Sequence, residues 1–117
     1  TIPYEIGYFE SLEELNLAGN QLKELPNEIY TLKNLKVLNL GDIISGGNQL
    51  RYISKNIEKL TNLEVLKIVW NDELKELPKE VLNLENLDFI SLSQKAILET
   101  DVGREIEERF CIDFEDF

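Results

Sequence analysis

Carboxylates are the commonest side chains in this sequence that are capable of acid–base chemistry. The 117 residues include 23 aspartates and glutamates, one cysteine and no histidine. A pair of carboxylates can catalyse glycoside hydrolysis, but here the acidic residues are spread over the whole chain. No serine or cysteine lies in a motif with a base nearby, so nucleophilic and histidine-based catalysis have no residues to use. The sequence predicts a protein that is not an enzyme and has no catalytic residues.

The sequence also lacks the residue patterns that bind metals or cofactors. Zinc lacks a ligand set of cysteines and histidines. Asp113, Glu115 and Asp116 carry suitable oxygen atoms for calcium, but their spacing matches no calcium loop, so a solvated tail is the preferred interpretation. The glycine-containing segment 41–47 lacks the lysine of a phosphate-binding loop. We expect no metal and no cofactor, and we expect unpaired Cys111 to be a small buried or edge residue.

The charge of the chain limits its partners. The formal net charge is −11, which argues against nucleic acid or an anionic membrane as a partner. No hydrophobic run is long enough to span a bilayer, so we expect no membrane insertion. Much of the negative charge lies in residues 98–117. This acidic segment is either a solvated terminus that prevents end-to-end association, which is the preferred interpretation, or a surface for a basic partner.

One short unit is written several times along the chain. The positions of the first full unit are Leu12, Leu15, Leu17, Asn20, Leu22 and Leu25. They return 23 residues later at Leu35 and then at Leu38, Leu40, Asn48, Leu50 and Ile53. The next two intervals are longer, because segment 43–47 is inserted in one unit and segment 71–74 has one extra residue in another. A period of about 20–29 residues indicates a solenoid whose units stack to share one core.

Each unit contains a half-buried strand and a short helical turn. Apolar residues alternate with mostly polar ones in segments 15–17, 38–40, 66–68 and 90–92, which is the pattern of a strand. The spacing in Leu25-Pro26-x-x-Ile29-x-x-Leu32 fits a short helical or 3₁₀ turn that begins at the proline. Asn20, Asn48 and Asn71 follow the strands at the corner, where an amide can bond to freed backbone groups. We call these three residues the asparagine ladder and expect it to end at Lys95.

These motifs resemble the leucine-rich repeat family, in its 23-residue form with a Leu-Pro-x-x-Ile turn, as in Ras-suppressor-like and many bacterial proteins. The resemblance covers residues 2 to about 98 and implies an α/β solenoid. This fold is a right-handed superhelix with short parallel strands on the concave face and helical or 3₁₀ turns on the convex face. We expect a single domain, 1–117, with a C-terminal helix-plus-strand cap at 99–117. The expected units are a partial repeat at 1–9 and repeats at 10–32, 33–60, 61–84 and 85–98.

The concave face is the expected binding surface, for a protein or peptide of unknown identity. Contiguous exposed apolar surface with aromatic residues is typical of interaction sites. The candidate contacts are Val37, Val65, Lys67, Val69, Trp70 and Phe89. Two other interpretations remain open. β-Branched and aromatic residues are also favoured in strands that bind nothing, and Trp70 can fold back over the extra residue of its turn. Ile43 and Ile44 either bind or pack on the corner.

The beginning of the chain bears on its origin. It starts within a half-repeat and contains no methionine, so we expect a fragment or processed product, acidic and soluble. Removal of a signal peptide would make it an exported or cell-surface bacterial protein. We expect self-association through an uncapped N-terminal edge. The alternative to a binding module is a structural repeat segment of a larger protein, with no binding site of its own.

Overall fold

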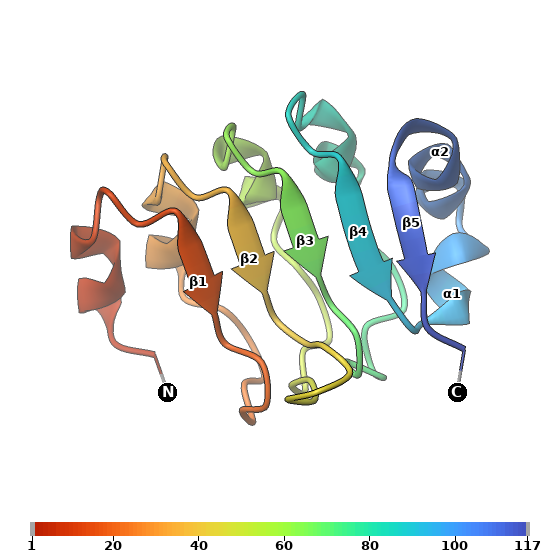
Figure 1. Ribbon diagram of the computed structural model, residues 1–117, viewed down its shortest axis with the longest axis horizontal. Coiled ribbons are helices and arrows are strands. Elements are labelled where there is room, and N and C mark those ends of the chain that lie inside the picture. Colours follow the sequence, from red (N-terminus) through yellow and green to blue (C-terminus); the bar gives the residue numbers. More distant parts are fainter. Residues whose placement is uncertain (1, 117) are drawn as a thin grey trace.

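One parallel sheet forms the front of the molecule (Figure 1). The computed structural model describes residues 2–116. Five strands pair in sequence order from β1 to β5. Their bounds are β1 Glu14–Asn16, β2 Val37–Asn39, β3 Val65–Lys67, β4 Phe89–Leu92 and β5 Cys111–Phe114. Consecutive parallel strands need a crossover connection, and here each crossover is one turn of an α/β solenoid.

Short 3₁₀ helices form the side of the solenoid behind the sheet (Figure 1). They are η1 Tyr4–Tyr8, η2 Asn27–Thr31, η3 Lys55–Lys59 and η4 Lys79–Asn83. Pro3, Pro26 and Pro78 precede three of them at the N-cap, where a missing N–H and a fixed φ cost nothing. Ser54 takes this place before η3, and its hydroxyl accepts a hydrogen bond from the Asn56 N–H at 3.1 Å. The expected 3₁₀ turns are confirmed.

The core is a stack of aliphatic layers, one from each turn. Leu15 pairs in register with Leu38, then Leu66, Ile90 and Ile112. The middle members Leu38, Leu66 and Ile90 are 0% exposed, whereas the outer two are only partly buried. No turn can bury its leucines alone, so burial is completed by neighbours on both sides.

The asparagines at the ends of the strands bond from one turn to the next. The Asn48 side-chain amide donates to the Leu17 and Leu40 carbonyls at 3.0 and 2.9 Å, and its oxygen accepts from the Leu22 N–H. Asn71 is 0% exposed. Its amide donates to the carbonyls of Leu40, Ile68 and Val69, and its oxygen accepts from the backbone of Asn48 and Leu50. Exposed Asn20 donates to the carbonyls of Leu17 and Ala18, both in its own turn.

The row of side-chain amides continues one turn beyond Asn71, through Gln94. Gln94 is buried, and its amide donates to the Ile68 and Asn71 carbonyls, both at 2.8 Å. Lys95, the residue expected at this position, is exposed and begins a helix instead. Glutamine has one methylene more than asparagine, so from one position earlier it still reaches the Ile68 carbonyl of the preceding turn, and lysine has no acceptor atom. The expectation for Lys95 was wrong.

A second row of asparagines joins the turns on the approach to the strands. The side-chain amides of Asn34, Asn62 and Asn86 donate to the carbonyls of Glu10, Lys33 and Thr61 at 2.7–2.8 Å. Each asparagine precedes the first leucine of its repeat, so the recurring Asn-Leu pair is the sequence signal of this row. These bonds tie each turn to the preceding one at the corner opposite the asparagine ladder.

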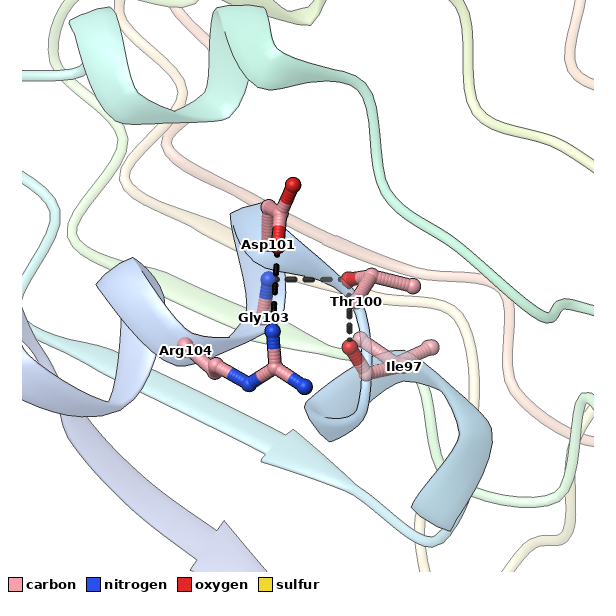
Figure 2. Close-up of polar contacts among 5 residues, drawn as sticks. All are labelled: Ile97, Thr100, Asp101, Gly103 and Arg104. Atoms are coloured by element: carbon pink, nitrogen blue, oxygen red, sulfur yellow. Dashed lines mark hydrogen bonds and ion pairs between the residues drawn. The ribbon is translucent and has the colours of Figure 1, made fainter.

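Two helices and the last strand close the C-terminal end. The helices are α1 Lys95–Leu98 and α2 Asp101–Arg109. Figure 2 shows the corner between them, where the Thr100 hydroxyl donates to the Ile97 carbonyl and accepts from the Gly103 N–H. A Cβ at Gly103 would overlap the Ile97 carbonyl, so this close approach requires glycine. The helix-plus-strand cap is as expected, with Thr100 as the N-cap residue. Within residues 2–116, no helix has the length and apolar character needed to cross a membrane.

Candidate binding surface

Two rows of side chains cross the sheet on the face opposite the core. The first row consists of Glu14, Val37, Val65, Phe89 and Cys111. The second consists of Asn16, Asn39, Lys67, Ser91 and Asp113. Successive side chains of a strand point to opposite faces, so both rows flank the buried aliphatic layer and face the other way. We call these two rows the concave surface.

The two rows differ in character. The middle of the first row is apolar, and Val37, Val65 and Phe89 are each partly exposed. The second row is polar, with Asn39 and Ser91 nearly buried and Lys67 partly exposed. The concave surface therefore has an apolar band next to a band of hydrogen-bonding groups.

The insertion after β2 forms a hydrogen-bonded projection beside the concave surface. Asp42 and Gly46 exchange backbone hydrogen bonds at 3.1 and 2.9 Å. The Asp42 carboxylate accepts from the backbone N–H groups of Ile44 and Ser45 and from the Asn39 side chain. These donors, the Ser45 N–H first, lower the pKa of Asp42 below its ordinary value of 3.8. We call segment 42–46 the isoleucine loop.

The two isoleucines of this loop point into solvent. Ile43 is 57% exposed and Ile44 is 91% exposed. The interpretation that they pack on the corner was wrong, because the Asp42 hydrogen bonds hold the loop as a turn that lifts both side chains away from the core. Exposed isoleucines on a loop fixed by hydrogen bonds are pre-organised for contact.

A cavity joins the isoleucine loop to the concave surface. Its volume is about 210 Å³. Apolar groups come from Ile43, Ile44 and Phe89, and polar groups come from both the loop and strands β3 to β5. The full lining is Asp42, Ile43, Ile44, Lys67, Phe89, Ser91, Asp113 and Glu115. This arrangement can hold an apolar side chain with polar or charged groups around it.

Two carboxylates at the β5 end of this cavity interact with each other. Partial burial raises the pKa of Glu115 above the ordinary 4.5, and a hydrogen bond and charge repulsion from Asp113 raise it further. The Ser91 hydroxyl lies 3.4 Å from the Asp113 carboxylate. The carboxylates therefore share a site where negative charge is in excess. Among residues 2–116, no group of three or more histidine, cysteine or acidic side chains is arranged to hold a metal ion.

Comparison with known proteins agrees with this geometry. A family model described as leucine-rich repeats in two copies matches residues 10–46. The solved structure of a leucine-rich repeat protein from Leptospira interrogans matches with a TM-score of 0.81 and 35% identity, over 97% of this chain. The chain is a leucine-rich repeat protein.

A plant peptide hormone receptor, RGFR1 in complex with RGF2, also resembles this leucine-rich repeat protein. The match has a TM-score of 0.61 and 37% identity over 80% of this chain. The chain spans 28% of the Leptospira protein and 15% of the receptor, so it corresponds to a few turns of each. A search of curated proteins finds no match.

The prediction that Val69 contacts a partner of this leucine-rich repeat protein was wrong. Val69 is 0% exposed, so it offers no surface to a partner. Strand β3 ends at Lys67, and beyond it the alternation of faces no longer holds. The backbone of Gly41 and Gly47 lies directly against the backbone of Val69, and the neighbouring turn covers this position.

Trp70 lies apart from the other candidates. Its φ of 64° is left-handed, as is the φ of 74° at Gly19, the equivalent position two turns earlier. A bulky residue rarely adopts this conformation. Trp70 lines a second cavity, of about 600 Å³, together with Asp72, Lys95 and Phe114, whereas Phe89 lines the cavity at the isoleucine loop. The four candidates that remain on the concave surface are Val37, Val65, Lys67 and Phe89.

Exposed Cys111 completes the first row at the edge of β5. The isoleucine loop, Asp113 and Glu115 were not among the residues predicted for this surface. The register of the strands contains the signal for Asp113, because the fifth strand continues the row of Lys67 and Ser91. The signal for the loop is weaker, since an insertion alone does not tell which face it covers.

Proposed function

We propose that this chain is a non-catalytic module that binds a protein or peptide through its concave surface. Leucine-rich repeat folds commonly mediate protein binding, and they are generally not enzymes. The observation that supports the proposal most is the apolar band of Val37, Val65 and Phe89 continued by an isoleucine loop that exposes 91% of Ile44. Exposed apolar groups at a concave site mark an interaction surface more often than neutral surface.

The dimensions of the sheet suit an extended peptide. Five parallel strands spaced about 4.8 Å apart span ~19 Å from β1 to β5. An extended chain advances about 3.3 Å per residue, so roughly six residues of a partner cross the whole surface. A partner of this length would contact both the first row and the isoleucine loop.

The receptor comparison supports the same class of partner. RGFR1 was solved in complex with RGF2, and the present chain resembles part of that receptor. Trp70 stays a predicted contact for a partner that extends past the end of β3. The alternative function is a structural segment of a larger repeat protein, in which this surface binds nothing.

A random-peptide display library tests the proposal directly. The unmodified chain is the target, and selected peptides are then measured against Ile44→Ser and Phe89→Ala. We expect both substitutions to weaken binding by about tenfold or more, as truncation of central contact residues does. Ile44→Ser should leave thermal unfolding unchanged, because the side chain is 91% exposed.

Matched controls lie elsewhere on the solenoid. Tyr8→Ser removes an exposed apolar side chain, 71% exposed, from η1, and Lys33→Ala removes an exposed charge on the approach to β2. Both variants should bind like the parent. Selection of no peptide, or peptides whose binding depends on Tyr8 and Lys33 instead of Ile44 and Phe89, would contradict the concave site and favour the structural alternative.

A further inference from the structure

The carboxylates at the β5 end of the concave surface lack a cation. Within residues 2–116 the two ion pairs join Lys36 to Glu13 and Arg104 to Asp101. Asp113 and Glu115 belong to neither pair, although both line the cavity at the isoleucine loop. Partial burial raises the pKa of Glu115, and a hydrogen bond with Asp113 and charge repulsion between the two carboxylates raise it further. A positive group placed between them would remove that repulsion.

The other charged groups of this cavity do not supply that positive group. Asp42 is occupied by the two N–H groups of its own loop and by the Asn39 amide. Lys67 is the single cation among the lining residues, and its charge acts on the Asp42 carboxylate, whose pKa it helps to lower. The cavity therefore has three carboxylates and one ammonium group. Its surplus of negative charge lies at Asp113 and Glu115.

Apolar contact is available in the same cavity. Ile43 and Ile44 come from the loop and Phe89 from β4, and all three line the cavity together with the two carboxylates. An apolar side chain of a partner, lying between the isoleucines and Phe89, would bring the adjacent residues of that partner to the β5 end. Side chains two residues apart in an extended chain point to the same face and lie about 6.6 Å apart along its axis, which suits a basic residue two positions from the apolar one.

We propose that the occupant of the concave surface is an extended cationic peptide segment, in which an apolar side chain packs between the isoleucine loop and Phe89 and a lysine or arginine two positions away pairs with Asp113 and Glu115. This inference rests on the proposed function and specifies the chemistry of the partner. Arginine suits the site best, because its planar guanidinium can bond to both carboxylates at once.

Charge argues against other occupants. A second copy of this chain carries the same net charge of −11, so two concave surfaces would repel each other. Nucleic acid and anionic lipid are excluded by the same sign of charge. A basic segment is attracted over a distance, which raises its rate of association as well as its affinity.

The test begins with the sequences of the peptides selected in the display experiment. We expect peptides dependent on Ile44 to be enriched in arginine or lysine two positions from an apolar residue. One such peptide is then synthesised in three forms, with the basic residue kept, replaced by glutamine, or replaced by glutamate. Fluorescence anisotropy should give an affinity about tenfold weaker for the glutamine form and weaker still for the glutamate form, and the difference should shrink as salt is added.

Variants of the protein distinguish a specific ion pair at Asp113 and Glu115 from general charge attraction to the acidic chain. In Asp113→Asn combined with Glu115→Gln, the basic peptide should bind no better than the glutamine peptide. The glutamine peptide itself should be unaffected. Glu73→Gln combined with Glu76→Gln changes the net charge equally at exposed positions of another turn, and it should leave the preference for the basic peptide intact.

Each result has a separate meaning. If selected peptides depend on Ile44 and Phe89 but carry no basic residue, or ignore the Asp113 and Glu115 substitutions, the cationic partner is wrong while the concave site stands. Equal loss in the Glu73 and Glu76 control would show general charge attraction and would also overturn the inference. If no peptide depends on the concave surface, the proposed function fails and this inference fails with it.

Discussion

Replacement of Asn71 by alanine should be far more costly than the same change at Asn20. Asn71 is 0% exposed, and its side-chain oxygen accepts hydrogen bonds from the backbone N–H groups of Asn48 and Leu50 at 3.2 and 3.3 Å. Alanine leaves both donors buried without an acceptor. Each unsatisfied buried group costs about 1–3 kcal/mol. Since partial relaxation reduces the sum, we expect a loss of about 3 kcal/mol in the free energy of unfolding.

The other asparagines form a graded control series. Asn48 accepts one backbone N–H, that of Leu22, at 3.0 Å, so Asn48→Ala should cost about 1–3 kcal/mol. Asn20 is exposed, and both of its hydrogen bonds are donated within its own turn. Water can replace those bonds, so Asn20→Ala should cost less than about 1 kcal/mol.

Urea unfolding followed by circular dichroism measures these differences. With an m-value of about 2 kcal/mol/M, a loss of ~3 kcal/mol lowers the midpoint by ~1.5 M, and the slope should stay unchanged. A domain of this size is stable by roughly 5–15 kcal/mol, so the Asn71 variant should still fold. Equal costs for Asn71→Ala and Asn20→Ala would refute the assignment of a structural role to the buried amides.

Two further predictions concern the backbone and pH. A Cβ at Gly41 would overlap the Val69 backbone, whereas one at Gly46 meets open space at a φ of 88°. Gly41→Ala should therefore lower stability by about 3 kcal/mol or more, and Gly46→Ala by about 1–2 kcal/mol; similar urea midpoints for the two would be contrary evidence. Affinity for a basic peptide should fall as pH decreases from neutral towards the raised pKa of Glu115, because protonation removes charge shared with Asp113. Calorimetry at several pH values should show it, and a pH-independent affinity would contradict the pairing.

The repeat interval was enough to predict most of the fold. It aligned the strands in the register that the structure has, with Val65 opposite Phe89 and Leu66 opposite Ile90, because buried apolar positions recur once per turn. The interval did not predict the place of Gln94, since a longer side chain does the same bonding from a different position. The repeat interval and the apolar pattern determine on which face of the sheet a strand residue lies. They do not determine which side chain hydrogen-bonds to the preceding turn.

The surface was less predictable than the core. Val69 follows the strand, and the backbone turns at Trp70 with a φ of 64°, so extending the alternation beyond Lys67 gave the wrong direction. The isoleucine loop depends on hydrogen bonds from Asp42 to its own backbone, and the face it covers is set by three-dimensional packing. Asp113 and Glu115 were assigned to an acidic tail because only the fifth strand brings them beside Phe89.

Chemical-shift mapping tests the central claim most directly. The backbone amide signals of the isotope-labelled chain are recorded by NMR while a peptide selected by display is added. We predict that the largest changes occur at Ile44, Val65, Phe89 and Asp113, from the isoleucine loop and three different strands. Changes confined to η2, η3 and the turns behind the sheet, with those four signals unmoved, would contradict binding at the concave surface.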